Sequence, residues 1–186
     1  MRYGVDLDGV CFDFLNPFRI CLNGAFNLEL EEHEITNYFW HENTDGLTKE
    51  GFFKEFHKFG HEGGYRNLAL LPGTLDALER IENAGHQIFY ITNRPDYVRE
   101  DTIAALKEHG FPFSKNLFFA NGDKSSLVNK LNIGVFIEDA AHTILDIANH
   151  TDAYVYCVDY PYNKKVEHVN VERIKDWDDF LLAEAI

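Results

Sequence analysis

The sequence predicts an α/β fold in which a doubly wound parallel sheet is covered by helices on both faces. Two observations support this prediction. From residue 71 onward, short apolar runs alternate with longer stretches of helical periodicity, which is the pattern of repeated strand–helix units. The chain also begins with a short strand-like run over residues 3–7, and acidic residues follow it directly, as in a buried strand that ends in a polar loop.

The first strand is predicted from the apolar residues at positions 3, 5 and 7, with Asp6 and Asp8 at or beyond its carboxyl end. In an extended chain these two carboxylates lie on the same side. Like charges that close are costly unless a cation lies between them or one binds a proton. A metal-assisted nucleophile at Asp6, with Asp8 as general acid and base, fits this pattern. A solvated Asp-rich turn is the alternative that D-x-D-G alone leaves open.

Residues 15–70 show helical spacing without strand alternation and are predicted to be a small helical insertion. The expected domains are therefore a core of residues 1–14 and 71–186 and an insertion of residues 15–70. One helix is expected from about Leu15, although Pro17 restricts its start, and a second has a phenylalanine face within residues 52–59. Aromatic residues in such a block usually form its own core. We favour that interpretation over a binding pocket for Tyr38, Phe39, Trp40 and Tyr65.

The rest of the chain alternates regularly between helices and strands. Helices are predicted over residues 74–84, 96–109, 124–132 and 176–185, with a further one that ends near Asn149. Strands are predicted over residues 87–91, 116–120, 134–137 and 153–158. Gly85 and Gly110 are suitable stops for the first two helices.

Polar residues follow most of the predicted strands. Asp6 and Asp8 follow the first, Thr92 the second, and Glu138 with Asp139 a later one, while Lys124 starts a helix after another. In open parallel sheets, ligands bind outside the carboxyl ends of the strands. Acids, a hydroxyl group and a lysine brought together at that edge are the groups that metal-assisted phosphoryl transfer needs.

Composition limits the class of protein. The 186 residues carry 31 acidic and 17 basic side chains, a formal net charge of -14, which disfavours binding of nucleic-acid polymers. The three cysteines lack C-x-x-C spacing and suit reduced thiols, and neither a signal peptide nor a membrane span is expected. We therefore expect a cytoplasmic protein that acts on a small molecule, with a homodimer left open.

Four motifs in this sequence, D-L-D-G-V, I-T-N-R-P, G-D-K and I-E-D-A, resemble those of the haloacid dehalogenase-like (HAD) phosphohydrolases and occur in the same order. Within that superfamily, V-D-L-D-G-V-C-F-D-F, L-L-P-G-T and P-Y-N are similar to the cytosolic type C 5'(3')-deoxyribonucleotidases. The resemblance implies a HAD-like (Rossmannoid) core with a small helical cap inserted after the first strand, at residues 15–70. It also implies a magnesium-dependent nucleotide phosphatase.

The resemblance implies a role for each matching residue. Asp6 resembles the aspartyl nucleophile and Asp8 the acid/base. Thr92, Asn93 and Lys124 resemble the residues that bind the phosphoryl group. The third motif departs from the mammalian deoxyribonucleotidases, which carry an arginine near this lysine.

The expected Mg2+ ligands are Asp6, the Asp8 carbonyl and Asp139, with Glu138 supporting them without binding the metal directly. Phe14 matches a position that stacks on the base in the similar nucleotidases, and a contact between cap and core is its alternative. Arg94 has two open interpretations, contact with the phosphate or pairing with Asp96.

The expected function is hydrolysis of a small phosphomonoester through an aspartyl-phosphate intermediate, with a nucleoside monophosphate as the favoured substrate. Two alternatives stay open. One is a phosphatase of the same fold that acts on a sugar phosphate or another metabolite, and the other is a non-catalytic binding protein that keeps the fold.

Overall fold

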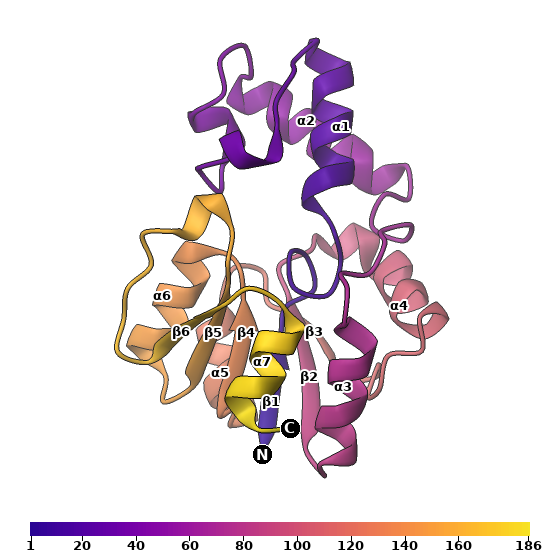
Figure 1. Ribbon diagram of the computed structural model, residues 1–186. Coiled ribbons are helices and arrows are strands. Elements are labelled where there is room, and N and C mark those ends of the chain that lie inside the picture. The colour runs from indigo at the N-terminus through magenta and orange to yellow at the C-terminus, as the bar shows by residue number, and fades with distance from the viewer.

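The computed structural model describes residues 1–186 and contains one six-stranded sheet in the order β3-β2-β1-β4-β5-β6 (Figure 1). All neighbouring strands are parallel. The strands are β1 (Arg2–Val5), β2 (Gln87–Thr92), β3 (Leu117–Phe119), β4 (Val135–Glu138), β5 (Tyr154–Val158) and β6 (Val171–Ile174). The order reverses on either side of β1, as in a doubly wound fold, so the predicted fold class is confirmed.

Helices cover both faces of this sheet (Figure 1). One apolar core includes residues of α3 (Thr74–Asn83), α4 (Arg99–Glu108) and α7 (Trp177–Glu184). The other includes residues of α5 (Lys124–Leu131) and α6 (Ala141–His150). The central strands are buried on both faces, which explains why they read as nearly continuous apolar runs.

A glycine lets the two central strands pack closely. Gly4 of β1 is opposite Phe136 of β4, and a Cβ atom at Gly4 would lie 2.3 Å from the Phe136 ring. Any larger residue at position 4 would therefore push apart the strands that carry the acidic residues to the sheet edge.

The inserted segment, which we define as residues 15–70, lies above the carboxyl edge of the sheet, away from both chain termini (Figure 1). It contains α1 (Leu15–Phe26), η1 (Glu32–Glu34), η2 (Trp40–Glu42) and α2 (Lys49–His61). None of the helices in the structure is both long and apolar enough to span a bilayer.

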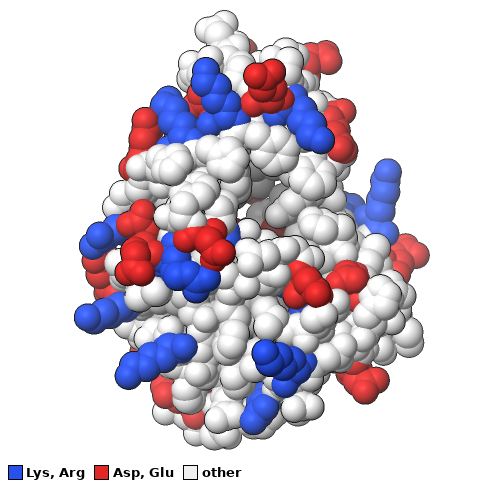
Figure 2. All heavy atoms as spheres, turned by 180° about the vertical axis from the view of Figure 1, so that it is seen from behind, with Lys and Arg blue, Asp and Glu red and all other residues white.

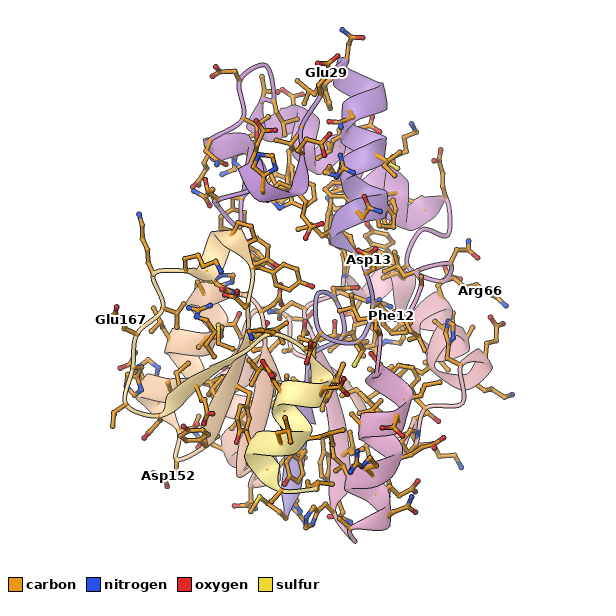
Figure 3. The ribbon with its side chains drawn as sticks, in the orientation of Figure 1. Phe12, Asp13, Glu29, Arg66, Asp152 and Glu167 are labelled. Carbon is orange, nitrogen blue, oxygen red and sulfur yellow. The ribbon has the colours of Figure 1, made fainter.

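The residues just before the inserted segment pair with its last residues. Phe12 and Leu70 form an antiparallel bridge, and the backbone N–H of Asp13 donates to the carbonyl of Ala69 at 2.9 Å. Figure 3 labels Phe12 and Asp13, which lie where the upper and lower parts of the ribbon join. The connection is therefore a short hydrogen-bonded ribbon and not two independent linkers.

The structure adds three local details to the sequence-based expectation. Pro17 does not delay α1, because it lies in the first turn, where no N–H donor is needed. Thr48 caps α2 by accepting from the Gly51 N–H at 3.1 Å. Strand β6 was not predicted, since its central residues, Glu172 and Arg173, are exposed at the sheet edge and break the apolar pattern.

Candidate active site

The polar residues singled out in the sequence meet at the carboxyl edge of the sheet. Asp6 follows β1, Thr92 ends β2, and Glu138 ends β4, while Lys124 is the first residue of α5. All four are buried. Parallel strands bring their carboxyl ends to one edge, and the reversal of strand order beside β1 opens the space that these side chains share.

Lys124 links two of the carboxylates. Its Nζ atom donates to Oδ1 of Asp6 at 2.5 Å and to Oε2 of Glu138 at 2.7 Å. Burial alone would lower the pKa of Lys124, but attraction to Asp6 and Glu138 raises it above its usual value. The lysine is therefore charged, and it fixes one oxygen of Asp6 while leaving Oδ2 without a hydrogen-bond donor.

Glu138 is held at both of its oxygens. Oε2 accepts from Lys124, and Oε1 accepts from the backbone N–H groups of Asp139 and Ala140, each at 3.1 Å. These contacts orient the loop that carries Asp139. They also occupy the oxygens of Glu138, which leaves Asp6 and Asp139 as the carboxylates with an oxygen free of hydrogen bonds.

Carboxylate oxygens of Asp6, Glu138 and Asp139 all lie within 4.8 Å of one another. A set of oxygen atoms without nitrogen or sulfur suits Mg2+ or a similar hard cation. Gly9 has φ of +77°, and a Cβ atom there would lie 2.6 Å from Oδ2 of Asp139. The loop after β1 can thus approach Asp139 only with glycine at position 9, and the residues present fit a divalent cation.

Burial changes the proton affinity of these acids. Removal from water raises the pKa of Asp6 to about 7; Lys124 opposes this shift, whereas repulsion from Glu138 and Asp8 adds to it. Burial also raises the pKa of Asp139 well above its usual value, with further contributions from Glu138 and Asp6. A divalent cation among these oxygens would lower both pKa values by attraction.

Asp8 is held in a different way. Nε of Arg94 donates to Oδ2 of Asp8 at 2.9 Å, and Nη2 donates to Oδ1 at 2.7 Å. Asp96 pairs instead with Arg99 at 2.5 Å. Arg94 therefore does not pair with Asp96, because its guanidinium contacts a carboxylate that is 86 residues away.

Thr92 ends β2, Asn93 begins the loop after it, and both line the same cavity. Oγ1 of Thr92 accepts from the backbone N–H of Arg94 at 3.1 Å, so its hydroxyl hydrogen can still be donated. Oδ1 of Asn93 accepts from the Gly122 N–H at 2.9 Å, which ties this loop to the loop before Lys124. The Asn93 NH2 group is left to donate.

A cavity of about 190 Å3 lies between these polar residues and the inserted segment. Figure 2 shows a hollow between the upper and lower parts of the molecule, with a largely uncharged rim. The wall contributed by the inserted segment and its junction is apolar, apart from the hydroxyl and indole N–H groups of its tyrosines and tryptophan. It consists of Phe14, Leu15, Tyr38, Phe39, Trp40, Phe52, Phe53, Phe56 and Tyr65.

Aromatic residues of the inserted segment line this cavity more extensively than the sequence suggested. Trp40 and Tyr65 are buried in its core and also line the cavity, whereas Tyr38 and Phe39 are more than a third exposed. Phe14 lines the cavity and also packs against Phe18, Phe56, Phe59 and Tyr65, as expected for a structural contact.

Two residues of the site were not assigned a role from the sequence. The Tyr162 hydroxyl donates to Oδ2 of Asp139 at 2.5 Å, and Nδ2 of Asn163 donates to the Asp139 backbone carbonyl at 2.8 Å. Arg173 holds Asn163 by donating to its Oδ1 at 2.6 Å. Their position in the sequence could have identified them. P-Y-N follows closely on the carboxyl end of β5, as the acidic residues follow β1 and β4.

Known proteins with similar sequences cover nearly the whole chain. A protein of Oceanobacillus iheyensis named "Putative nucleotidase" is 28% identical over 189 residues, which span 97% of each chain. A protein of Chlorobaculum tepidum named "Putative 5'(3')-deoxyribonucleotidase" is 24% identical over 192 residues, 97% of this chain and 89% of its own length.

The fold is also that of solved HAD hydrolases. A HAD family hydrolase of Deinococcus radiodurans, whose crystal structure holds phosphate and sodium, superposes with a TM-score of 0.71 at 14% identity, covering 99% of this chain and 94% of its own. Residues 1–185 match the family described as 5' nucleotidase, deoxy (pyrimidine), cytosolic type C protein. The chain therefore belongs to this family, has the fold of the solved HAD hydrolases and is a phosphoric monoester hydrolase.

Proposed function

We propose that this protein hydrolyses nucleoside monophosphates with the help of Mg2+, through a phosphorylated Asp6. The main support for the proposal is that a single cavity has two chemically different sides. One wall holds the carboxylates, Lys124 and Thr92, and the other is aromatic. A substrate that fits both walls has a phosphate at one end and a flat apolar group at the other, as a nucleotide has.

Asp6 is the proposed nucleophile. Lys124 holds Oδ1, so the side chain cannot turn freely, and Oδ2 is left to attack phosphorus. The O–P bond that forms replaces the bond to the leaving alkoxide, which takes a proton from Asp8. Water that gives a proton to Asp8 then releases phosphate and restores Asp6.

Thr92 and Asn93 are proposed to bind the phosphoryl oxygens. Both line the cavity and keep a donor that the protein does not use. Lys124 adds positive charge beside Asp6, which opposes the negative charge of the transferred group.

Mg2+ is proposed to bind Asp6, the Asp8 backbone carbonyl and Asp139, and it supplies charge neutralisation for the phosphoryl group. Four carboxylates, Asp6, Asp8, Glu138 and Asp139, face only two cations, Lys124 and Arg94. A dianionic phosphate would meet net repulsion there unless a further cation were bound.

The inserted segment is proposed to act as the cap that selects the leaving group, with residues 1–14 and 71–186 as the catalytic core. Its cavity wall carries no amide or charged side chain. The similarity to a protein named as a deoxyribonucleotidase supports a nucleotide as the substrate.

The test is a phosphate-release screen over nucleoside monophosphates and sugar phosphates, with and without a chelator. We expect turnover of nucleotides that disappears with the chelator and returns with Mg2+. Asp6→Asn, which changes one atom of the nucleophile, is the matched inactive control. Better turnover of sugar phosphates would replace the nucleotidase assignment by a metabolite phosphatase. Full activity in metal-free buffer would exclude the metal-assisted mechanism.

A further inference from the structure

We propose that Arg94 is a positioning residue for Asp8, and that it connects the aromatic cavity wall to this acid/base. The inference rests on the proposed function, because it assigns a partner to the residue that protonates the leaving group. The guanidinium and the carboxylate make two parallel N–H···O hydrogen bonds, at 2.9 and 2.7 Å. Such a paired geometry fixes the direction of a carboxylate as well as its position.

Arg94 is itself rigidly held. Its side chain has no exposed surface, and Nη1 donates to Oγ1 of Thr102 at 3.2 Å. Thr102, which is also fully buried, donates in turn to the carbonyl of Val98 at 2.9 Å. The guanidinium therefore has a fixed direction before any substrate binds.

Arg94 lines the cavity, but the hydrogen bonds that it makes are all to protein side chains, and two of them go to Asp8. Nε and Nη2 point their donors at Asp8, and Nη1 is bonded to Thr102. Asp8 is 22% exposed, so it is the member of the pair that can reach a substrate. Each carboxylate oxygen has two lone pairs, and the arginine uses one on each, so a second remains for the proton of the leaving group.

Two aromatic rings from the junction of the inserted segment lie against the guanidinium. Its central carbon is 5.0 Å from the centre of the Phe12 ring and 4.8 Å from that of Tyr65. Tyr65 is stacked on Phe14, with ring centres 5.6 Å apart and an angle of 12° between their planes. Phe12 and Phe14 both come just before the first helix of the inserted segment. Figure 3 labels Phe12 where the upper and lower parts of the ribbon join.

These contacts form a continuous path, Phe14 to Tyr65 to Arg94 to Asp8. Phe14 and Tyr65 both line the cavity where the leaving group is proposed to bind. A leaving group that packs against these rings therefore presses on the side chains that keep the arginine aimed at Asp8. Through this path, binding energy of the correct leaving group can help to place Asp8, which protonates that group.

The test uses Arg94→Lys, which keeps the positive charge but cannot form the paired hydrogen bonds. Two substrates are compared, a nucleoside monophosphate and 4-nitrophenyl phosphate, whose leaving group needs little help from an acid. We expect kcat/KM for the nucleotide to fall up to about a hundredfold, as for a misplaced catalytic group, and to fall much less for the nitrophenyl ester. Arg99→Lys, which alters a surface pair with Asp96 at the start of α4, is the matched control.

A double-mutant cycle with Asp8→Asn completes the test. If Arg94 acts through Asp8, adding Arg94→Lys to Asp8→Asn should cost no further activity. Thr102→Val, which removes the hydrogen bond to Nη1 without touching the cavity, should shift the substrate ratio in the same direction. Thermal unfolding of each variant identifies any loss of folded protein.

Equal losses on both substrates, or a full additional loss in the Asp8→Asn background, would overturn the proposal and assign Arg94 to phosphate binding or to folding. The result is separable from the nucleotidase assignment. If the wild-type protein hydrolyses a different alkyl phosphate, the same comparison is made with that ester.

Discussion

Tyr162 donates its hydroxyl hydrogen to Oδ2 of Asp139 over 2.5 Å. The two residues come from different loops, after β5 and β4, and Asn163 holds the backbone of Asp139 in the same way. Asp139 is therefore fixed at one carboxylate oxygen and at its carbonyl, and its other carboxylate oxygen is left for a cation. Mutation of a group that orients a metal ligand typically costs about ten- to a hundredfold in metal affinity or activity.

The first prediction is that Tyr162→Phe weakens Mg2+ binding. We expect the Mg2+ concentration for half-maximal activity to rise about tenfold or more, because Asp139 loses the donor that orients it. The measurement is phosphate release as a function of Mg2+ concentration. Tyr154→Phe is the control, since it removes the same kind of hydroxyl–carboxylate bond, to Glu172, at the protein surface. An unchanged Mg2+ requirement in Tyr162→Phe would contradict the assignment.

The second prediction concerns stability and pH in the absence of metal. The pKa of Asp6 rises from 3.8 to about 7 on folding, so the folded protein binds a proton more tightly than the unfolded chain. Stability should consequently fall as pH rises from about 4 to 7. Asp139, whose pKa is also raised, acts in the same direction.

Asp6→Asn should remove part of this pH dependence, because an amide cannot ionise. In a chelator at pH 8 we expect its melting temperature to exceed that of the wild type, by on the order of 5 °C. At pH 5 the two should differ less, and Mg2+ should stabilise the wild type more than the variant. A variant that melts lower than the wild type at pH 8 would show that Asp6 is not destabilised by its surroundings.

Much of the core could be predicted from the sequence. Alternating apolar runs and helical periods define a parallel sheet, and residues just after its strands must meet at one edge. Asp6, Thr92, Lys124 and Glu138 were found in this way, and the structure brings them together. Strand β6 was missed because an edge strand of four residues with an exposed centre has little apolar signal.

Contacts that depend on how two loops face each other could not be predicted. The Arg94–Asp8 pair joins residues 86 apart, and nothing in I-T-N-R-P distinguishes a guanidinium that points at Asp8 from one that points at Asp96. The exposure of Phe39 likewise depends on the short turn before η2, which has no periodic pattern. Local patterns fix the elements, but the relative placement of loops decides these partners.

The third prediction is that the protein discriminates weakly between nucleobases of equal size. The cavity wall of the inserted segment offers stacking surfaces and only tyrosine hydroxyl and indole N–H groups for hydrogen bonding. Discrimination above about a thousandfold normally needs buried polar groups that a wrong substrate leaves unpaired. We expect kcat/KM for dUMP and dCMP to agree within about tenfold. A preference above a hundredfold for either would show that a polar group reads the base edge.

The last prediction separates Phe39 from Phe14. Phe39 lines the cavity and is 39% exposed, so its ring has surface free for a base, whereas Phe14 is packed against four aromatic rings. Stacking on an aromatic side chain is worth about 1–3 kcal/mol per base. Phe39→Ala should therefore lower kcat/KM for a nucleoside monophosphate by roughly five- to a hundredfold. Hydrolysis of ribose 5-phosphate, which has no base, should change little.

Phe14→Ala should behave differently, because it also removes contacts inside the inserted segment. We expect a loss on both substrates and a lower melting temperature, consistent with about 3–5 kcal/mol for a fully buried phenylalanine and less for this half-buried one. The measurements are kcat/KM on the nucleotide and on ribose 5-phosphate, together with thermal unfolding of both variants. A loss confined to the nucleotide in Phe14→Ala, with Phe39→Ala unaffected, would place the base on Phe14. Because Phe14 is itself stacked on Tyr65, the base would then contact the first ring of the path that leads through Tyr65 to Arg94.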